Sequence, residues 1–206
     1  MRYFILLFFF VSMSSTAQVR QDGKWSIEGS AGLHIPFSPS NFINTSDYIA
    51  FKQFQLSLRY MFNDKYGLKG HYARNRFEDK NNHGIGTTYN RIALEGIINF
   101  GNVFDFGRRS DFDLLGHLGG GLTFVPYPNA EDPYDNIGNI TLGFTTLYPV
   151  GRGVDVLADI TFVKGFEVQH GYNGEMIDKG KLPHDGYGGA FVNISVGLVI
   201  YILPNR

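Results

Sequence analysis

The ionisable side chains that could do chemistry in this sequence recur at alternate positions of otherwise apolar segments. His34, His71 and His117 share such positions with acidic residues, and imidazole beside carboxylate is the usual material of metal sites and hydrolytic triads. The sequence has no cysteine, no His-Glu-x-x-His motif and no Gly-x-Ser-x-Gly motif. We therefore expect no catalytic residue, metal site or cofactor, and we expect that the chain is not an enzyme.

Eight further charged residues lie on the polar side of the same alternating segments. Buried charge is costly unless it is paired, so we expect these residues to meet in one network. Such a network can fix the fold, which is the role we favour, or act as a gate that opens a narrow pore. The members of this predicted lumen charge network are Glu28, Arg59, Lys69, Arg91, Glu95, Asp113, Asp155 and Asp159.

The segments that carry these charges have the period-two alternation of β-strands with two different faces. In one of them Phe54, Leu56 and Leu58 alternate with Gln55 and Ser57. Eight such segments are predicted, at residues 25–35, 53–62, 66–73, 91–100, 112–124, 139–148, 154–163 and 192–202.

The connections between these segments also alternate. Short turns follow the second and sixth segments, a longer turn at 101–110 follows the fourth, and long polar stretches follow the odd-numbered ones. Short turns at one end and long loops at the other are typical of outer-membrane barrels. The predicted fold class is all-β, an eight-stranded antiparallel up-and-down transmembrane β-barrel, formed by residues 18–206.

Alternation alone does not decide which face lies outside, since a soluble barrel of the lipocalin kind has an apolar interior. Two features favour the inverted arrangement. The polar face is strongly ionic, and aromatic residues lie near both ends of the apolar stripes, as in the interfacial girdles of membrane barrels. The predicted aromatic girdle consists of Trp25, Phe62, Tyr66, Tyr72, Phe100, Phe112 and Phe124.

The N-terminus and the composition agree with an exported chain. Arg2 precedes the apolar run 3–11, and Ser15 and Ala17 suit a signal-peptidase site, so residues 1–17 are predicted to be a cleaved signal peptide. The 26 glycines, 19 phenylalanines and 12 tyrosines suit close strand contacts and aromatic belts. The net charge of −1 gives no reason to expect nucleic acid as a partner.

Several stretches resemble the N-terminal barrel of OmpA-like proteins of the Bacteroidetes type. These are RYMFNDKYGLKGHY at 59–72, RIALEGIINFG at 91–101, DNIGNITL at 135–142 and the closing segment 191–203. The closing segment is also similar to the signal read by the barrel-assembly machinery, with Ser195, Gly197, Ile200 and Ile202 at its pattern positions. The resemblance therefore implies insertion by that machinery. The family's C-terminal peptidoglycan-binding domain has no counterpart before Arg206, so tethering to peptidoglycan is not carried over.

The leading hypothesis is a porin-like or structural protein in the outer membrane of a Gram-negative bacterium, with a side-chain-filled lumen and little or no conductance. Its expected partners are outer-membrane lipid and lipopolysaccharide. An alternative is a surface binding or adhesion module that acts through its loops. Three loops carry this alternative: 79–84, 165–186, and 126–135, whose acids suit a divalent cation. A lipid-modifying enzyme that uses Ser, His and an acid is the third hypothesis.

Overall fold

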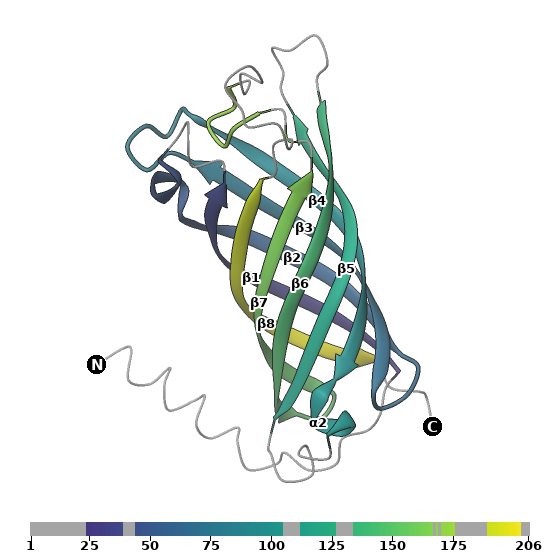
Figure 1. Ribbon diagram of the computed structural model, residues 1–206. Coiled ribbons are helices and arrows are strands. Elements are labelled where there is room, and N and C mark those ends of the chain that lie inside the picture. Colours follow the sequence, from purple (N-terminus) through teal and green to yellow (C-terminus); the bar gives the residue numbers. More distant parts are fainter. Residues whose placement is uncertain are drawn as a thin grey trace, which may run out of the picture.

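The computed structural model describes residues 24–38, 44–104, 112–126, 134–166, 168, 170–175 and 189–202. Eight strands dominate this part of the chain (Figure 1). They are β1 (Trp25–Ser38), β2 (Ala50–Met61), β3 (Tyr66–Glu78), β4 (Gly86–Asn99), β5 (Asp113–Pro126), β6 (Tyr134–Gly151), β7 (Val154–Phe166) and β8 (Ala190–Ile202). Two short helices accompany them, η1 (Thr45–Tyr48) and α2 (Phe100–Val103).

Each strand pairs antiparallel with its neighbour in the sequence, and β8 pairs with β1 to close the sheet. The fold class predicted from the sequence, a closed eight-stranded antiparallel barrel, is confirmed. Closure gives every strand a partner on both sides, so the described sheet has no unpaired edge. None of the helices in the described part of the chain is long and apolar enough to cross a membrane.

The two ends of the barrel differ, and we call them the turn end and the loop end. At the turn end, β2 and β3 are joined through residues 62–65, where the side chain of Asn63 accepts hydrogen bonds from the backbone N–H groups of Lys65 and Tyr66. β6 and β7 are joined there by a tight turn in which Gly153 has a φ of 78°, a left-handed conformation that glycine adopts without strain. Helix α2 lies at the same end, and η1 lies at the loop end (Figure 1).

Several strands extend further toward the loop end than the alternation predicted. β3 continues to Glu78 instead of ending at residue 73, β4 begins at Gly86 instead of 91, and β6 begins at Tyr134 instead of 139. The apolar stripe stops earlier because the outward positions become polar, with Arg74, Arg76 and Thr88. Strand pairing continues past the apolar belt, and the connections after β3 and β5 are shorter than predicted.

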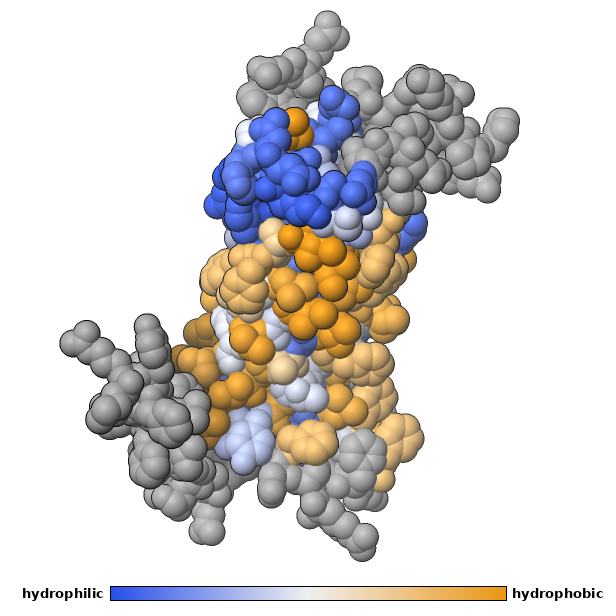
Figure 2. Space-filling view, turned by 90° about the vertical axis from the view of Figure 1, so that its left-hand side faces the viewer, coloured by the Kyte–Doolittle hydropathy of each residue, from blue (hydrophilic) through white to orange (hydrophobic). Residues whose placement is uncertain are grey.

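The apolar side chains lie on the outside of the barrel and the ionic ones lie inside. Leu56, Leu94 and Ile194 are 50%, 59% and 41% exposed, whereas Arg59 and Glu95 are 2% and 1% exposed. The space-filling view shows the result as a hydrophobic belt below a hydrophilic band at one end (Figure 2). This inverted arrangement is the one that requires lipid around the belt.

A charge placed on the belt provides a test of this arrangement. Leu94→Arg, at the middle height of the belt, is expected to lower the free energy of unfolding by about 2–4 kcal/mol, because a midplane arginine faces hydrocarbon. Ile202→Arg, at the turn end, is the matched control and should cost about 0–1 kcal/mol. Urea titration of the protein folded in lipid vesicles measures both. Equal costs at the two positions would contradict a lipid-facing belt.

Candidate functional site in the barrel interior

The predicted lumen charge network is buried inside the barrel, and two ion pairs occupy its centre. Arg59 on β2 contacts Glu28 on β1, with Nη1 and Oε1 3.0 Å apart. Lys69 on β3 contacts Glu95 on β4, with Nζ and Oε2 2.8 Å apart. Each pair joins neighbouring strands, because side chains directly opposite or diagonal in an antiparallel ladder lie within reach of one another.

A histidine extends the second pair across the lumen. His117 on β5 lies between two carboxylates, with Nδ1 3.1 Å from Glu95 Oε2 and Nε2 3.1 Å from Asp159 Oδ2. The hydroxyls of Thr145 and Thr161 also donate to Asp159. The resulting chain from Lys69 to Asp159 connects β3, β4, β5 and β7 through the centre of the barrel.

The position of His117 depends on the absence of a side chain opposite it. Gly143 on β6 faces the ring, and a Cβ built on Gly143 would lie 2.6 Å from two ring atoms of His117. Both ring nitrogens of His117 face carboxylates, so this imidazole is not aligned on a nucleophile. The arrangement suits charge pairing better than acid–base catalysis, and the expectation that the chain is not an enzyme stays a prediction.

The other three members of the predicted network have different surroundings. Arg91 donates from Nε to His71 Nε2 at 3.4 Å, its guanidinium lies 5.7 Å from the ring centroid of Phe191, and it has no carboxylate within 4.0 Å in the described residues. Asp113 accepts from Asn99 and Asp155 accepts from Tyr201, both near the turn end. The structure therefore places Arg91 against aromatic and imidazole rings, where the sequence predicted acids.

The remaining inward histidines do not form a metal site. His71 Nδ1 lies 3.6 Å from Glu95 Oε2, and the ring of His34 packs 4.3 Å from that of Phe77. Among the residues that the structure describes, no group of three or more His, Asp or Glu side chains is arranged to hold a metal ion.

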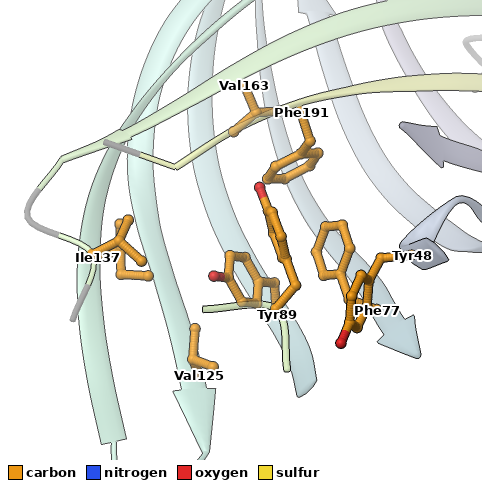
Figure 3. Close-up of a cluster of buried hydrophobic side chains, with 9 residues drawn as sticks. Tyr48, Phe77, Tyr89, Val125, Ile137, Val163 and Phe191 are labelled. Atoms are coloured by element: carbon orange, nitrogen blue, oxygen red, sulfur yellow. The ribbon is translucent and has the colours of Figure 1, made fainter. Parts of the chain in front are cut away.

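A large apolar cluster fills the lumen at the loop end, and the sequence analysis did not identify it (Figure 3). Phe77, Tyr89 and Phe191 project inward from β3, β4 and β8, with ring centroids 5.0–6.2 Å apart. Tyr48 of η1 joins the cluster with its ring centroid 6.3 Å from that of Tyr172, and burial raises the pKa of its phenol. The loop-end cluster is Tyr48, Phe77, Tyr89, Val125, Ile137, Val163, Val168, Tyr172 and Phe191.

A second, smaller apolar cluster lies toward the turn end. Met61 and Tyr201 pack against it, and the turn-end cluster itself is Ile97, Leu115, Leu147, Leu157 and Val199. The two ion pairs therefore lie between apolar clusters, and the turn-end cluster is accompanied by the buried acids Asp113 and Asp155. The sequence contains an indication of the turn-end cluster, because the otherwise polar inward faces of three strands each include an apolar residue, namely Ile97, Leu115 and Leu157. The cluster could have been predicted from these residues.

The segment after β7 differs from the solvated loop that the sequence suggested. Val168 and Tyr172 are buried in the loop-end cluster, and the Tyr172 hydroxyl donates to the carbonyl of Ala190 at 3.2 Å. His170 Nδ1 lies 3.6 Å from Asp135, which points inward from β6. Of the predicted cation-binding stretch 126–135, residues 127–133 lie outside the described residues. Residues 176–186 and the predicted signal peptide 1–17 also lie outside them.

The residues of the predicted aromatic girdle lie on the outer surface, and one of them belongs to a helix instead of a strand. Trp25, Phe62, Tyr66 and Phe112 are exposed at the turn end, and Tyr72 and Phe124 face outward further along the barrel. Phe100 was predicted to end the fourth strand, but it begins α2, because Asn99 caps that helix by accepting from the N–H of Asn102. Phe100 still packs near Phe144 on the outer wall.

The predicted assembly-signal residues lie on β8, the strand that closes the barrel. Ser195 is buried inside and donates to Ser30 of β1, whereas Ile200 and Ile202 face outward. Gly197 lies at the β8–β1 seam, where a Cβ would overlap the carbonyl oxygen of Gly29. The close approach of β8 to β1 therefore requires glycine at this position, whether or not the residue is also part of an assembly signal.

No protein-family model and no curated protein matches this chain. Solved structures do. The surface protein A of Neisseria (NspA) is 14% identical with a TM-score of 0.54, and covers 87% of this chain and 97% of its own. A major outer-membrane protein of Thermus thermophilus is 12% identical with a TM-score of 0.54, and covers 86% and 98%. The fold is that of an outer-membrane β-barrel.

The outer-membrane barrel fold agrees with the inverted polarity of the wall, which was established from burial alone. At these identities the likeness concerns the fold, which is the level at which the OmpA-like resemblance is supported. The side chains of the interior are this chain's own, and their arrangement must be tested on this chain.

The Glu28–Arg59 pair offers such a test. Glu28→Leu leaves the buried Arg59 without its carboxylate and should lower the free energy of unfolding by about 3–5 kcal/mol. The double variant Glu28→Leu/Arg59→Met replaces both charges by apolar groups and should regain most of that loss. Urea titrations in vesicles measure both variants. If the double variant costs as much as Glu28→Leu alone, or more, the pair does not balance charge in the way its geometry suggests.

Proposed function

We propose that this chain is a structural protein of the Gram-negative outer membrane, a porin-like barrel whose lumen does not conduct. The observation that carries the proposal is the order of layers in the interior. Apolar clusters lie on both sides of the paired charges, so an ion that entered the lumen from the loop end would have to pass the loop-end cluster before reaching those pairs. Charge buried in an apolar layer without a partner is strongly disfavoured.

The sealed interior favours the structural role of the charge network over the gating role. A gate needs a second arrangement of the charges with comparable free energy. Here the chain Lys69–Glu95–His117–Asp159 joins four strands, and Arg59–Glu28 joins two more. Separating these groups would leave buried charges unpaired, so the network holds the strands in one register.

The membrane location supplies the rest of the proposal. Residues 1–17 act as a cleaved signal peptide, and Ser195, Gly197, Ile200 and Ile202 on β8 serve recognition by the barrel-assembly machinery. The loop end then faces the outside, because the short turns of such barrels lie on the periplasmic side. No contact among the described residues favours adhesion, and residues 127–133 and 176–186 of the candidate loops lie outside them. That alternative stays a prediction, as does the absence of an enzymatic activity.

Conductance is the direct test. The purified wild-type protein in a planar lipid bilayer is expected to give no stable current steps, and liposomes that contain it should not swell in small sugars. A general-diffusion porin reconstituted in parallel is the positive control. A large, stable single-channel conductance from the wild-type protein would overturn the closed-lumen proposal.

Location is tested separately. In an outer-membrane fraction the protein should migrate on a gel at two mobilities, one for samples kept cool and another for boiled samples, since closed membrane barrels stay folded in detergent. The N-terminus of the mature protein should be Gln18 by mass spectrometry. Recovery in a soluble fraction, with one mobility, would contradict the membrane assignment.

A further inference from the structure

The outer wall of the barrel carries a cationic patch on β2 and β3, beyond the apolar belt toward the loop end. Lys52, Arg74 and Arg76 are exposed there and project outward. In the ladder Arg74 lies opposite Phe54 on one side and Asn90 on the other, so the patch begins where the apolar stripe of these strands ends. This position is the boundary between hydrocarbon and water on the side of the long loops.

The charges of this patch are not balanced. Glu78 is shared, since its Oε2 lies 2.6 Å from Lys52 Nζ and 2.9 Å from Arg76 Nε. Arg74 has no ion-pair partner among the residues that the structure describes. Three permanent cations therefore meet one carboxylate.

The neighbouring hairpin does not remove this positive excess. Lys80 is paired with Asp47 at 2.7 Å. Asp79 accepts hydrogen bonds from the backbone N–H groups of Asn81 and Asn82, so its carboxylate is directed into its own hairpin. The patch keeps an excess of positive charge that suits an anion.

A groove lies directly below the patch on the same strands. It is an open, apolar hollow of about 580 Å³ lined by Leu58, Gly70, Tyr72, Ile92 and Leu94, among others. Gly70 creates it, because a Cβ at this position would meet no atom within 4 Å while the leucines around it project outward. The hollow lies within the belt, where the surrounding medium is hydrocarbon, so its natural occupant is an acyl chain.

The groove and the patch are aligned along one strand. Gly70 and Arg74 are four residues apart on β3, a rise of about 13 Å at about 3.3 Å per residue. Between them the Tyr72 hydroxyl donates to Asn90 Oδ1 at 2.9 Å, which leaves the Asn90 amide nitrogen able to donate to a ligand. An apolar hollow thus leads to a group of cations and an amide donor at the membrane surface (Figure 2 shows the boundary between the belt and the hydrophilic band).

We infer that the outer wall of β2–β4 binds one anionic, phosphate-bearing lipid of the outer leaflet, with an acyl chain in the groove at Gly70 and the phosphate against Arg74. Lys52 and Arg76 add positive charge around the phosphate. Arginine suits this role because its planar guanidinium can donate two parallel hydrogen bonds to phosphate oxygens. A free phosphate ion would use the cations and leave the groove without a function, which is why the combination favours a lipid.

The inference rests on the proposed membrane location, and the experiment separates the two. The refolded protein in a nonionic detergent is titrated with lipid A, and bound lipid is counted by native mass spectrometry. The wild-type protein should retain one lipid A and bind phosphatidylcholine much more weakly. Arg74→Gln should weaken lipid A binding about tenfold, the scale of one lost charge-assisted hydrogen bond. Gly70→Leu places a side chain in the groove from a Cβ that meets no atom within 4 Å, and it should weaken lipid A binding by a similar factor.

Matched controls exist on the same barrel. Lys65→Gln removes an exposed cation at the turn end, and Gly138→Leu fills an outward glycine on β6 that also has no atom within 4 Å of a built Cβ. Both controls should bind lipid A as the wild type does. Equal losses in the controls and the test variants, or no preference for lipid A over phosphatidylcholine, would overturn the proposed site.

Two further outcomes are distinguishable. If inorganic phosphate displaces lipid A from the wild type and Gly70→Leu has no effect, the patch is a site for free anions and the lipid inference is wrong. Each variant is also checked for the heat-dependent gel shift. If the wild type lacks this shift, the membrane assignment fails, whereas a normal shift without lipid retention overturns the lipid site alone.

Discussion

The hydrogen bonding of the backbone is the constraint on which the rest of this structure depends. A strand in hydrocarbon must find a partner for every N–H and C=O group within the protein, because the solvent offers none. Antiparallel pairing of successive strands meets this demand everywhere except at the first and last strand. The β1–β8 seam closes the sheet, and its close approach at Gly197 shows how little space the closure leaves for side chains.

Closure then decides what the interior can contain. An eight-stranded barrel has a lumen that side chains can fill, and alternation directs every second residue into it. Charges placed there must be paired, as Glu28 is with Arg59 and Glu95 with Lys69. The pairs are buried, and an apolar cluster lies toward each end of the barrel. The interior is therefore an ionic centre between two apolar layers, in contrast to the uniform apolar core of a soluble barrel.

The outer wall faces hydrocarbon along the belt and water beyond it. Leucine and isoleucine cover it along the belt, and Arg74 and Arg76 replace them on the same face of β3 where the strand leaves the hydrocarbon. Because pairing does not depend on side-chain polarity, the strand continues unchanged through that boundary. One regular sheet thus presents a hydrophobic and a cationic surface in sequence, which is the basis of the lipid site inferred on β2–β4.

The sequence by itself determined the number of strands, their order, and the side of each that faces inward, since period-two alternation reports faces directly. It did not determine where β3, β4 and β6 reach the loop end, because alternation fades where both faces are polar. Only the tertiary structure decided which inward residues meet. Arg91 and Phe191 are distant in sequence, and Tyr48 and Tyr172 lie outside the strands, yet closure of the sheet brings all four to the same end of one lumen.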